Sequence, residues 1–215
     1  MDRFLDSAIS LLILVLLSPV FLIIGIMIKL TSKGPVFFTQ MRIGRNNELF
    51  KFYKFRTMEI GTPDVSTDKL DNSKNYVTLI GKFLRKSSLD ELPQLFNILK
   101  GDMTFVGPRP ALYNQYELKE MRTKAKVHVL LPGITGWAQI NGRDDNDDYE
   151  KTVHDVYYLN NKSLSLDIKI LFKTVFKVIS SDGIKDDGLK SMHDDRSKTM
   201  HDNGLKTKVY KDYQA

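Results

Sequence analysis

The sequence predicts a helix-rich α+β protein whose N-terminal segment lies in a membrane. No residue from Ser7 to Ile28 is charged, so this run has the character of a membrane helix. Residues 50–55 alternate aromatic side chains with lysines, as a half-buried strand does. Two later segments, which begin near Leu92 and Leu164, repeat apolar residues at helical spacing. These patterns indicate an apolar anchor followed by a mixed domain with amphipathic helices.

Length and composition fit one compact domain with an appendage: the chain has 215 residues, and 42% of them are hydrophobic. Cysteine is absent, which excludes disulfides and a catalytic thiol and suits a reducing compartment. The net charge is +6, and because residues 182–215 hold seven acidic and seven basic side chains, the excess lies in residues 1–181. This excess suits an anionic membrane surface or a phosphate-rich substrate. Nucleic acid is not expected as a partner, because zinc-finger spacing and RNA-binding signatures are missing.

The apolar run at the N-terminus is long enough to reach across a bilayer. At about 1.5 Å per residue it forms roughly 33 Å of helix, against about 30 Å of hydrocarbon. We expect a kink at Ser18-Pro19, because proline removes a backbone hydrogen bond, and the Ser18 hydroxyl is a candidate partner for a freed group. Bases flank both ends, so charge selects no orientation. A spanning helix, a helix that returns to the same face and a buried core helix all fit the run, whereas its length argues against a cleaved signal peptide.

Beyond this anchor, the chain divides into extended, polar and helical stretches. We expect extended structure with turns in residues 36–60, a loop in residues 61–75 and a polar, loosely ordered tail in residues 181–215. An amphipathic helix is predicted for Leu164–Ile179, with lysines on a second face. It fits either a core position with a solvated lysine face or a position on anionic lipid headgroups. Its apolar face comprises Leu164, Ile168, Leu171, Phe172, Val175 and Ile179.

A shorter helix is predicted directly after an acidic pair, Asp90-Glu91. Apolar residues then recur at helical spacing, with Pro93 in the first helical position and Gly101 as the C-terminal stop. A capping box that begins at Ser88 is an alternative start. In both cases the two acids lie at or just before a helix N-terminus, where the simplest role for them is to cap the helix.

Bases suited to phosphate chemistry surround the same acidic pair in the sequence. Arg85 lies five residues before Asp90, and Arg109 lies between two prolines in the segment 107–110. The guanidinium group of arginine matches phosphate oxygens two at a time. A carboxylate can attack phosphorus to give an acyl phosphate, and a neighbouring carboxylate can help to hold magnesium. An active site at Asp90 and Glu91 is therefore the alternative to helix capping.

Two further segments carry bases that could bind phosphate. Lys54 and Arg56 alternate in KFRTM at 54–58, so on an extended strand they lie on one face and either reach a pyrophosphate or remain surface charges. Residues 132–143 contain glycines that permit tight turns or a close approach to a ligand, and this segment ends in Arg143.

Taken together, these segments resemble the bacterial sugar transferases, the monotopic polyprenyl-phosphate phosphoglycosyl transferases of capsule, O-antigen and glycoprotein assembly. The resemblance extends from Asp2 to about Ile179. The matching segments, in chain order, are the Ser18-Pro19 break, KFRTM at 54–58, SSLDELPQLFNILKGDMTFVGPRP at 87–110, PGITGWAQINGR at 132–143 and DVYY at 155–158.

This resemblance implies an activity and its site residues. Such enzymes use magnesium to transfer a sugar 1-phosphate from a UDP-sugar to undecaprenyl phosphate, with release of UMP. The resemblance implies that Asp90 is a nucleophile that forms a covalent phosphosugar intermediate, and that Glu91 assists in metal binding or proton transfer, so that both are expected metal ligands. The expected phosphate- or nucleotide-binding residues are Lys54, Arg56, Arg85, Arg109 and Arg143.

The resemblance also implies a topology and a cellular context. Residues 1–35 would form a re-entrant membrane helix, and residues 36–180 a catalytic domain with interfacial amphipathic helices on the cytoplasmic face of the bacterial inner membrane. The product would enter surface polysaccharide or glycoconjugate synthesis, where downstream glycosyltransferases are expected partners. Two other functions fit the same residues: a membrane-bound hydrolase of nucleotide sugars, and a non-catalytic membrane scaffold of a polysaccharide assembly complex.

Overall fold

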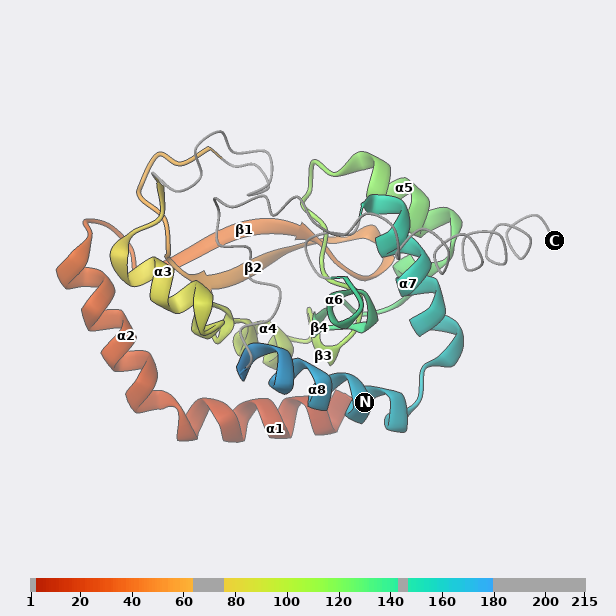
Figure 1. Ribbon diagram of the computed structural model, residues 1–215, viewed down its shortest axis with the longest axis horizontal. Helices are drawn as coiled ribbons and strands as arrows, with labels where there is room; N and C mark the ends of the chain where they lie inside the picture. The colour runs from red at the N-terminus through yellow and green to blue at the C-terminus, as the bar shows by residue number, and fades with distance from the viewer. Residues whose placement is uncertain (1–2, 64–75, 143–146, 180–215) are drawn as a thin grey trace, which may run out of the picture. The chain divides into compact units, whose positions relative to one another are not determined.

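A bent pair of helices begins the part of the chain that the computed structural model describes, which comprises residues 3–63, 76–142 and 147–179. Helix α1 (Arg3–Leu16) and helix α2 (Ser18–Thr31) meet at an angle of 62° (Figure 1). Within these described ranges no single helix is long and apolar enough to span a membrane, whereas the bent pair, taken together, meets both criteria.

Hydrogen bonding explains how the chain bends between these two helices. Pro19 has no N–H group, so the carbonyl of Val15, four residues earlier, lacks its usual helical donor. The Ser18 hydroxyl donates to this carbonyl at 2.9 Å instead. The predicted break at Ser18-Pro19 and the predicted role of the Ser18 hydroxyl are both confirmed.

An antiparallel hairpin follows the helix pair, which confirms the extended structure predicted for residues 36–60 and adds the strand pairing. Strand β1 (Phe37–Ile43) pairs with strand β2 (Leu49–Phe55) over their full lengths, with Phe37 opposite Phe55. The chain reverses through the 3-10 turn η1 (Arg45–Asn47). The hairpin therefore brings the end of β2 back to the beginning of β1, next to α2 (Figure 1).

The remaining elements are mostly short helices, so the predicted helix-rich α+β class is confirmed. A second sheet consists of two short parallel strands, β3 and β4, with Thr104 opposite Gly133 and Val106 opposite Thr135. In chain order the elements are α3 (Leu79–Lys86), the 3-10 turn η4 (Leu89–Glu91), α4 (Gln94–Lys100), β3 (Thr104–Val106), α5 (Tyr116–Lys124), the 3-10 turn η5 (Val127–Val129), β4 (Gly133–Thr135), α6 (Trp137–Ile140), α7 (Asp148–Asn161) and α8 (Leu164–Ile179).

Helix α4 begins one residue later than predicted and ends where predicted. Pro93 occupies the N-cap position, and Gly101, with a φ angle of 87°, ends the helix by donating its N–H to the carbonyls of Asn97 and Ile98. Ser88 has a φ angle of 56° and makes no side-chain cap hydrogen bond. The capping-box alternative is therefore wrong, because the chain makes a left-handed turn at Ser88 that separates α3 from η4.

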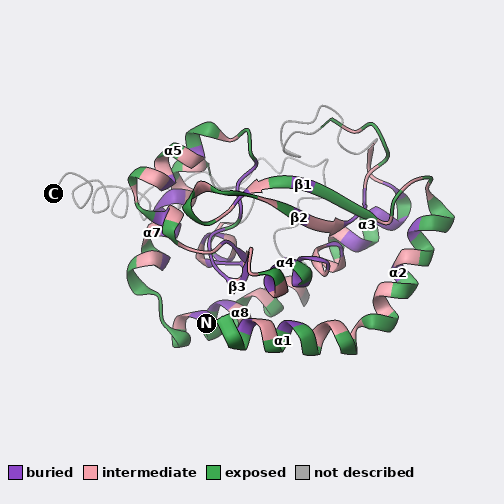
Figure 2. Cartoon of the chain, turned by 180° about the vertical axis from the view of Figure 1, so that it is seen from behind, coloured by how far each residue is buried: buried purple, intermediate pink, exposed green. Residues whose placement is uncertain are grey.

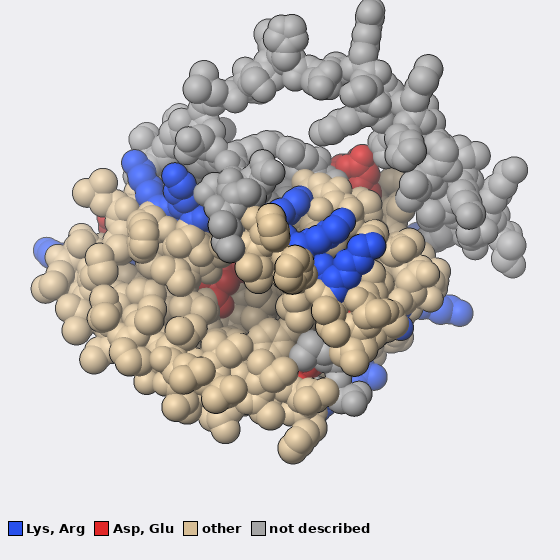
Figure 3. Space-filling model, turned by 60° about the horizontal axis from the view of Figure 1, so that its bottom comes forward, with Lys and Arg blue, Asp and Glu red and all other residues tan. Residues whose placement is uncertain are grey.

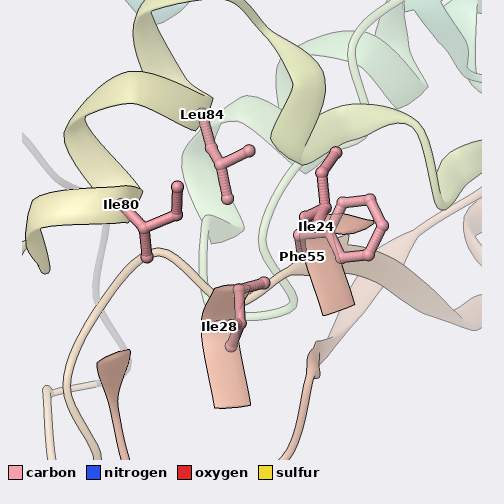
Figure 4. Close-up of a cluster of buried hydrophobic side chains, with 5 residues drawn as sticks. All are labelled: Ile24, Ile28, Phe55, Ile80 and Leu84. Carbon is pink, nitrogen blue, oxygen red and sulfur yellow. The ribbon is translucent and has the colours of Figure 1, made fainter. Parts of the chain in front are cut away.

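An apolar cluster attaches helix α2 to the rest of the protein. Ile24 and Ile28 of α2 pack with Phe55 of β2 and with Ile80 and Leu84 of α3 (Figure 4). Ile28 and Leu84 are fully buried, and Phe55 is 1% exposed. Burial of such side chains contributes roughly 1.5–3 kcal/mol each, so α2 is held firmly against the hairpin and α3.

Polar contacts attach helix α1 along one face. Arg3, Asp6 and Ser10 follow one another at helical spacing, and Asp6 and Ser10 are buried. Arg3 donates to the carbonyl of Lys100 at 3.3 Å, and the Thr104 hydroxyl donates to the Asp6 carboxylate at 2.6 Å. The Ser10 hydroxyl donates to a carbonyl of α4 at 2.8 Å. The opposite face of α1 is exposed and apolar (Figure 2).

Helix α8 turns four residues of its predicted apolar face outward, Leu164, Ile168, Phe172 and Val175, so the core interpretation is wrong for these four. Leu171 of the same face packs against a buried cluster. The most buried residues of α8 are Asp167 and Ile170, which are 1% and 0% exposed. Asp167 accepts a hydrogen bond from the buried Tyr158 hydroxyl at 2.7 Å, which fixes the rotation of the helix. Exposed apolar side chains on the other side are Leu164, Ile168, Phe172, Val175 and Phe176.

The close packing of α3 against the end of β2 makes a testable prediction. A Cβ atom at Gly81 would overlap the carbonyl oxygen of Thr57, which is backbone and cannot easily move. We expect Gly81→Ala to destabilise the protein by about 1–3 kcal/mol, measured by thermal unfolding. The matched control is Gly25→Ala in α2, where the added Cβ would meet Val36 at an ordinary 3.6 Å. Equal stability of the two variants would contradict this packing.

Candidate active site

The acidic pair lies in a 3-10 turn between two helices. Ser88 turns the chain after α3, and η4 then places Asp90 and Glu91 toward the interior. Asp90 is 6% exposed, and the Glu91 side chain is 19% exposed. Neither acid caps α4, because the N-cap position belongs to Pro93, which makes no side-chain cap hydrogen bond. The helix-capping interpretation is therefore wrong.

Two bases from distant parts of the chain contact the acidic pair. Lys54, near the end of β2, places its Nζ 3.4 Å from Asp90 Oδ2 and 2.8 Å from Glu91 Oε1. Arg109, in the segment after β3, places a guanidinium nitrogen 2.8 Å from the same Glu91 oxygen. The structure thus brings together four of the residues that the sequence suggested, in one charge cluster with two acids and two bases.

Arg85 lies beside this cluster without a direct ion pair to it. Its Nε donates to the hydroxyl of Thr57 at 3.1 Å. Its charge nevertheless lowers the pKa of Asp90, so the two groups lie within electrostatic range. Arg85 is partly exposed, and it extends the positive charge around the acidic pair.

Burial and charge shift the two carboxyl groups in opposite directions. Burial is the largest influence on Asp90 and raises its pKa, the negative charge of Glu91 raises it further, and Lys54 lowers it only in part. Burial would also raise the pKa of Glu91, but Arg109 and Lys54 together outweigh burial and hold it well below its usual range. Glu91 is therefore ionised throughout the physiological range, whereas Asp90 is the more easily protonated of the pair.

Of the other two predicted phosphate-binding residues, Arg56 does not join this cluster and Arg143 is not described by the structure. Arg56 is 6% exposed, and its guanidinium donates to the carbonyls of Ser32 and Lys33 and to the Ser32 hydroxyl, at 2.6–3.1 Å. It thereby ties the end of α2 to the end of β2, and a role in phosphate binding stays a prediction.

An ion pair behind Arg109 escaped the sequence analysis. Arg122 of α5 contacts Asp155 of α7 at 2.7 Å, and both side chains are almost fully buried. Arg122 also donates to the carbonyl of Arg109 at 2.9 Å. Asp155 belongs to the DVYY segment at 155–158, which carried part of the family resemblance, but no spacing pattern links it to Arg122.

The acidic pair offers oxygen atoms to a divalent cation. Within the described residues, Asp90 Oδ1 and Glu91 Oε2 accept no hydrogen bond, whereas the other oxygen of each carboxylate contacts Lys54. The described residues contain no cluster of three or more possible ligands. Magnesium is usually held by one or two carboxylates together with substrate phosphate oxygens and water, so this donor set fits magnesium only when a phosphate substrate is also present.

Sequence comparison defines the class of protein to which this fold and this charge cluster belong. The family described as bacterial sugar transferase matches residues 1–181, which is most of the chain. The chain therefore belongs to the bacterial sugar transferase family, as the ordered motifs predict.

Several curated proteins are similar to this chain. The UDP-glucose:undecaprenyl-phosphate glucose-1-phosphate transferase of Klebsiella pneumoniae is 44% identical over 81% of this chain and 39% of its own length. The UDP-N-acetylgalactosamine-undecaprenyl-phosphate N-acetylgalactosaminephosphotransferase of Aeromonas hydrophila is 39% identical over 85% of this chain and 44% of its own length. The uncharacterized sugar transferase EpsL of Bacillus subtilis is 41% identical over 86% of this chain and 90% of its own length. The chain thus spans less than half of the first two relatives and most of the third.

The shared ammonium of Lys54 makes a testable prediction about stability. We expect Lys54→Met to destabilise the protein by about 3–5 kcal/mol at neutral pH, because two buried carboxylates lose a counter-charge. The difference should shrink as the pH falls, because protonation of Asp90, whose pKa is already raised, removes the repulsion that Lys54 offsets.

Thermal unfolding at pH 8 and pH 5 measures this effect. Lys51→Met, at an exposed position on the same strand, is the matched control and should change stability little at either pH. A loss that is the same at both pH values, or no larger than that of the control, would show that Lys54 does not neutralise the pair.

Proposed function

We propose that this protein is a phosphoglycosyl transferase that moves a sugar 1-phosphate from a UDP-sugar to undecaprenyl phosphate and releases UMP. The observation that carries the proposal is the environment of the Asp90 carboxylate, which is nearly buried. One of its oxygens lies beside Lys54, and the other accepts no hydrogen bond from the described residues. The names of relatives about 40% identical to the chain support the same reaction, since they specify UDP-sugars and undecaprenyl phosphate. The transfer would begin the membrane stage of surface polysaccharide or glycoconjugate synthesis and supply later glycosyltransferases.

In the first half-reaction, Asp90 attacks the β-phosphorus of the UDP-sugar. A bond forms between a carboxylate oxygen and this phosphorus, and the bond from the phosphorus to the oxygen that bridges to the α-phosphate breaks. UMP leaves with that oxygen and its electron pair, so a phosphosugar remains on Asp90. Lys54, Arg85 and Arg109 supply the positive charge that lets an anionic nucleophile approach an anionic diphosphate.

In the second half-reaction, an oxygen of undecaprenyl phosphate attacks the same phosphorus. The bond to Asp90 breaks, which restores the carboxylate and yields undecaprenyl diphosphate linked to the sugar. A covalent intermediate allows a soluble donor and a lipid acceptor to use one site in turn, so the site need not hold both at once.

Glu91 is better suited to hold positive charge than to transfer a proton. Its pKa lies far below the physiological range because Arg109 and Lys54 outweigh burial, so it has no proton to donate at neutral pH. The same charge orients Lys54 and Arg109, which both contact its Oε1. Asp90 and Glu91 are also the residues that would hold magnesium, which when bound neutralises charge on the transferred phosphate.

Contacts at both ends of the helix pair support a re-entrant arrangement. At the beginning of α1, Arg3 contacts the end of α4, and at the end of α2, Ser32 and Lys33 contact Arg56. Because both ends are fixed to one folded body, the pair is proposed to enter the bilayer and return to the same face. Residues 36–180 would then form the catalytic domain on the cytoplasmic side of the inner membrane.

The exposed apolar surface of α1 and α8 is the proposed membrane contact. Seen from the side of these helices, the molecule presents a broad surface without charged side chains, beside which lysine and arginine side chains gather (Figure 3). Phe4, Leu12 and Leu16 of α1 are 83%, 59% and 66% exposed, and Phe172 of α8 is 70% exposed. Apolar patches of this kind with basic residues beside them suit anionic bilayers.

The proposed nucleophile is tested by UMP release from a panel of UDP-sugars, with undecaprenyl phosphate and magnesium. We expect Asp90→Asn to lower kcat by roughly three orders of magnitude or more, because the covalent route is lost. Without lipid, the wild type should release about one UMP per protein molecule, with a matching mass increase of the intact chain. Glu120→Gln, at an exposed carboxylate on α5, is the control and should keep full activity. Sustained UMP release without lipid would instead identify a hydrolase.

The re-entrant topology is tested by labelling introduced cysteines, since the chain has none of its own. One cysteine is placed before Met1 and another at Glu59, which is exposed on the catalytic domain. A membrane-impermeant maleimide should reach both in inverted membrane vesicles and neither in intact spheroplasts. Labelling of the two positions from opposite sides would reject re-entry.

A further inference from the structure

The segment 107–110 that carries Arg109 is held in place through its carbonyl groups. Two of its four residues are prolines, which have no N–H to donate. The Gly107 N–H donates to the carbonyl of Thr135 at 2.8 Å, and carbonyl groups attach the rest of the segment. Three consecutive carbonyls each accept a hydrogen bond from a different part of the fold: that of Pro108 from the Gly133 N–H at 2.9 Å, that of Arg109 from Arg122 at 2.9 Å, and that of Pro110 from Arg42 at 3.2 Å.

The middle donor, Arg122, is itself fixed by a buried carboxylate. Its Nε and one terminal nitrogen lie 2.9 Å and 2.7 Å from the same oxygen of Asp155, and the other terminal nitrogen donates to the Arg109 carbonyl. The side chains of Arg122 and Asp155 are 10% and 2% exposed. Because a guanidinium group is planar and rigid, these bonds tie the main chain at Arg109 to α7 through α5.

This ion pair is a costly way to stabilise the fold. The free-energy cost of removing two charges from water offsets most of the free energy gained from their attraction. Apolar side chains of similar size often stabilise a protein equally well. Burial raises the pKa of Asp155 even though Arg122 opposes this rise, which is a sign of that cost. What the pair provides, and apolar side chains would not, is a donor aimed at one carbonyl.

The side chain of Arg109 depends on this main-chain support. It is 45% exposed, and a guanidinium nitrogen lies 2.8 Å from Glu91 Oε1. Because the side chain has a fixed reach, a shift of the Arg109 main chain displaces the guanidinium relative to Glu91. In active sites a displacement of about 1 Å can lower the rate by roughly a hundredfold.

We propose that Arg122, held by Asp155, is a positioning residue that sets the place of the Arg109 guanidinium relative to Glu91 and the donor phosphates. The inference rests on the proposed function, because it assigns Arg109 to the transfer reaction. Arg122 touches no substrate in this proposal and acts only through the Arg109 carbonyl.

A double-mutant cycle on kcat/KM for UMP release tests the inference. We expect Arg122→Lys to lower kcat/KM about 10- to 100-fold, because lysine keeps the charge but cannot bond the Asp155 carboxylate and the Arg109 carbonyl in the same geometry. In an Arg109→Ala background the same change should have no further effect, since there is no guanidinium left to position. Losses that multiply in the double variant would overturn the inference.

Hydrogen exchange gives a readout that does not depend on activity. Arg122→Lys should speed amide exchange at Arg109, Ala111 and Leu112 and leave α3 unchanged. Asp155→Asn removes the charge that holds Arg122 and keeps the shape of the side chain. This variant should show the same exchange pattern as Arg122→Lys. In the Arg109→Ala background it should likewise have no further effect on activity. If Arg122→Lys fails to fold, the Asp155→Asn variant tests the positioning role in its place.

The matched control is Lys124→Met on the same helix. Lys124 forms an exposed pair with Glu120 one turn away, so its loss should change neither activity nor exchange at Arg109. Faster exchange at Arg109 without loss of activity would overturn the positioning role. A wild-type protein that releases no UMP from any donor would overturn the proposed function instead, so the two failures are distinguishable.

Discussion

Two neighbouring carboxylates can both remain ionised away from water only when positive charge reaches them. At Asp90 and Glu91 that charge comes from Lys54 on the hairpin and from Arg109 on the segment after β3. Neither base can reach the pair unless the hairpin, η4 and the parallel strands take up fixed relative positions. The charges of Asp90 and Glu91 are therefore neutralised only when the domain has assembled. The resulting cluster of acids and bases is the arrangement that phosphate transfer needs.

Local patterns in the sequence were sufficient wherever a structure is built from neighbouring residues. The break at Ser18-Pro19, the extended stretch after the helix pair and the stop at Gly101 were all predictable, because each depends on patterns or bonds within a few residues. The choice between capping and catalysis at Asp90 was not predictable from local chemistry, because both roles place a carboxylate beside a helix start. Capping is ruled out because Pro93, and neither acid, holds the N-cap position of α4. The base beside Asp90 is Lys54, which lies 36 residues earlier in the chain.

Where the sequence analysis fell short, the missing information was three-dimensional. Alternation put Lys54 and Arg56 on one face, but β2 ends at Phe55, so the Arg56 side chain turns to the carbonyls at the end of α2. Helical periodicity located the apolar residues of α8 but could not tell whether they are buried or exposed, since the spacing is the same in both cases. Arg122 and Asp155 lie 33 residues apart on two helices, and no spacing rule joins them.

The break between α1 and α2 lies in the stretch from Val15 to Pro19, in which the serine hydroxyl replaces the hydrogen bond that proline removes. Contacts this close in sequence form on the timescale of helix formation, and the N-terminal part of a chain is the first to leave the ribosome. The local determinants of the break are thus complete during synthesis, before the hairpin or the acidic pair exists. The 62° angle of the finished fold also depends on later contacts, which attach α1 to α4 and α2 to the hairpin and α3.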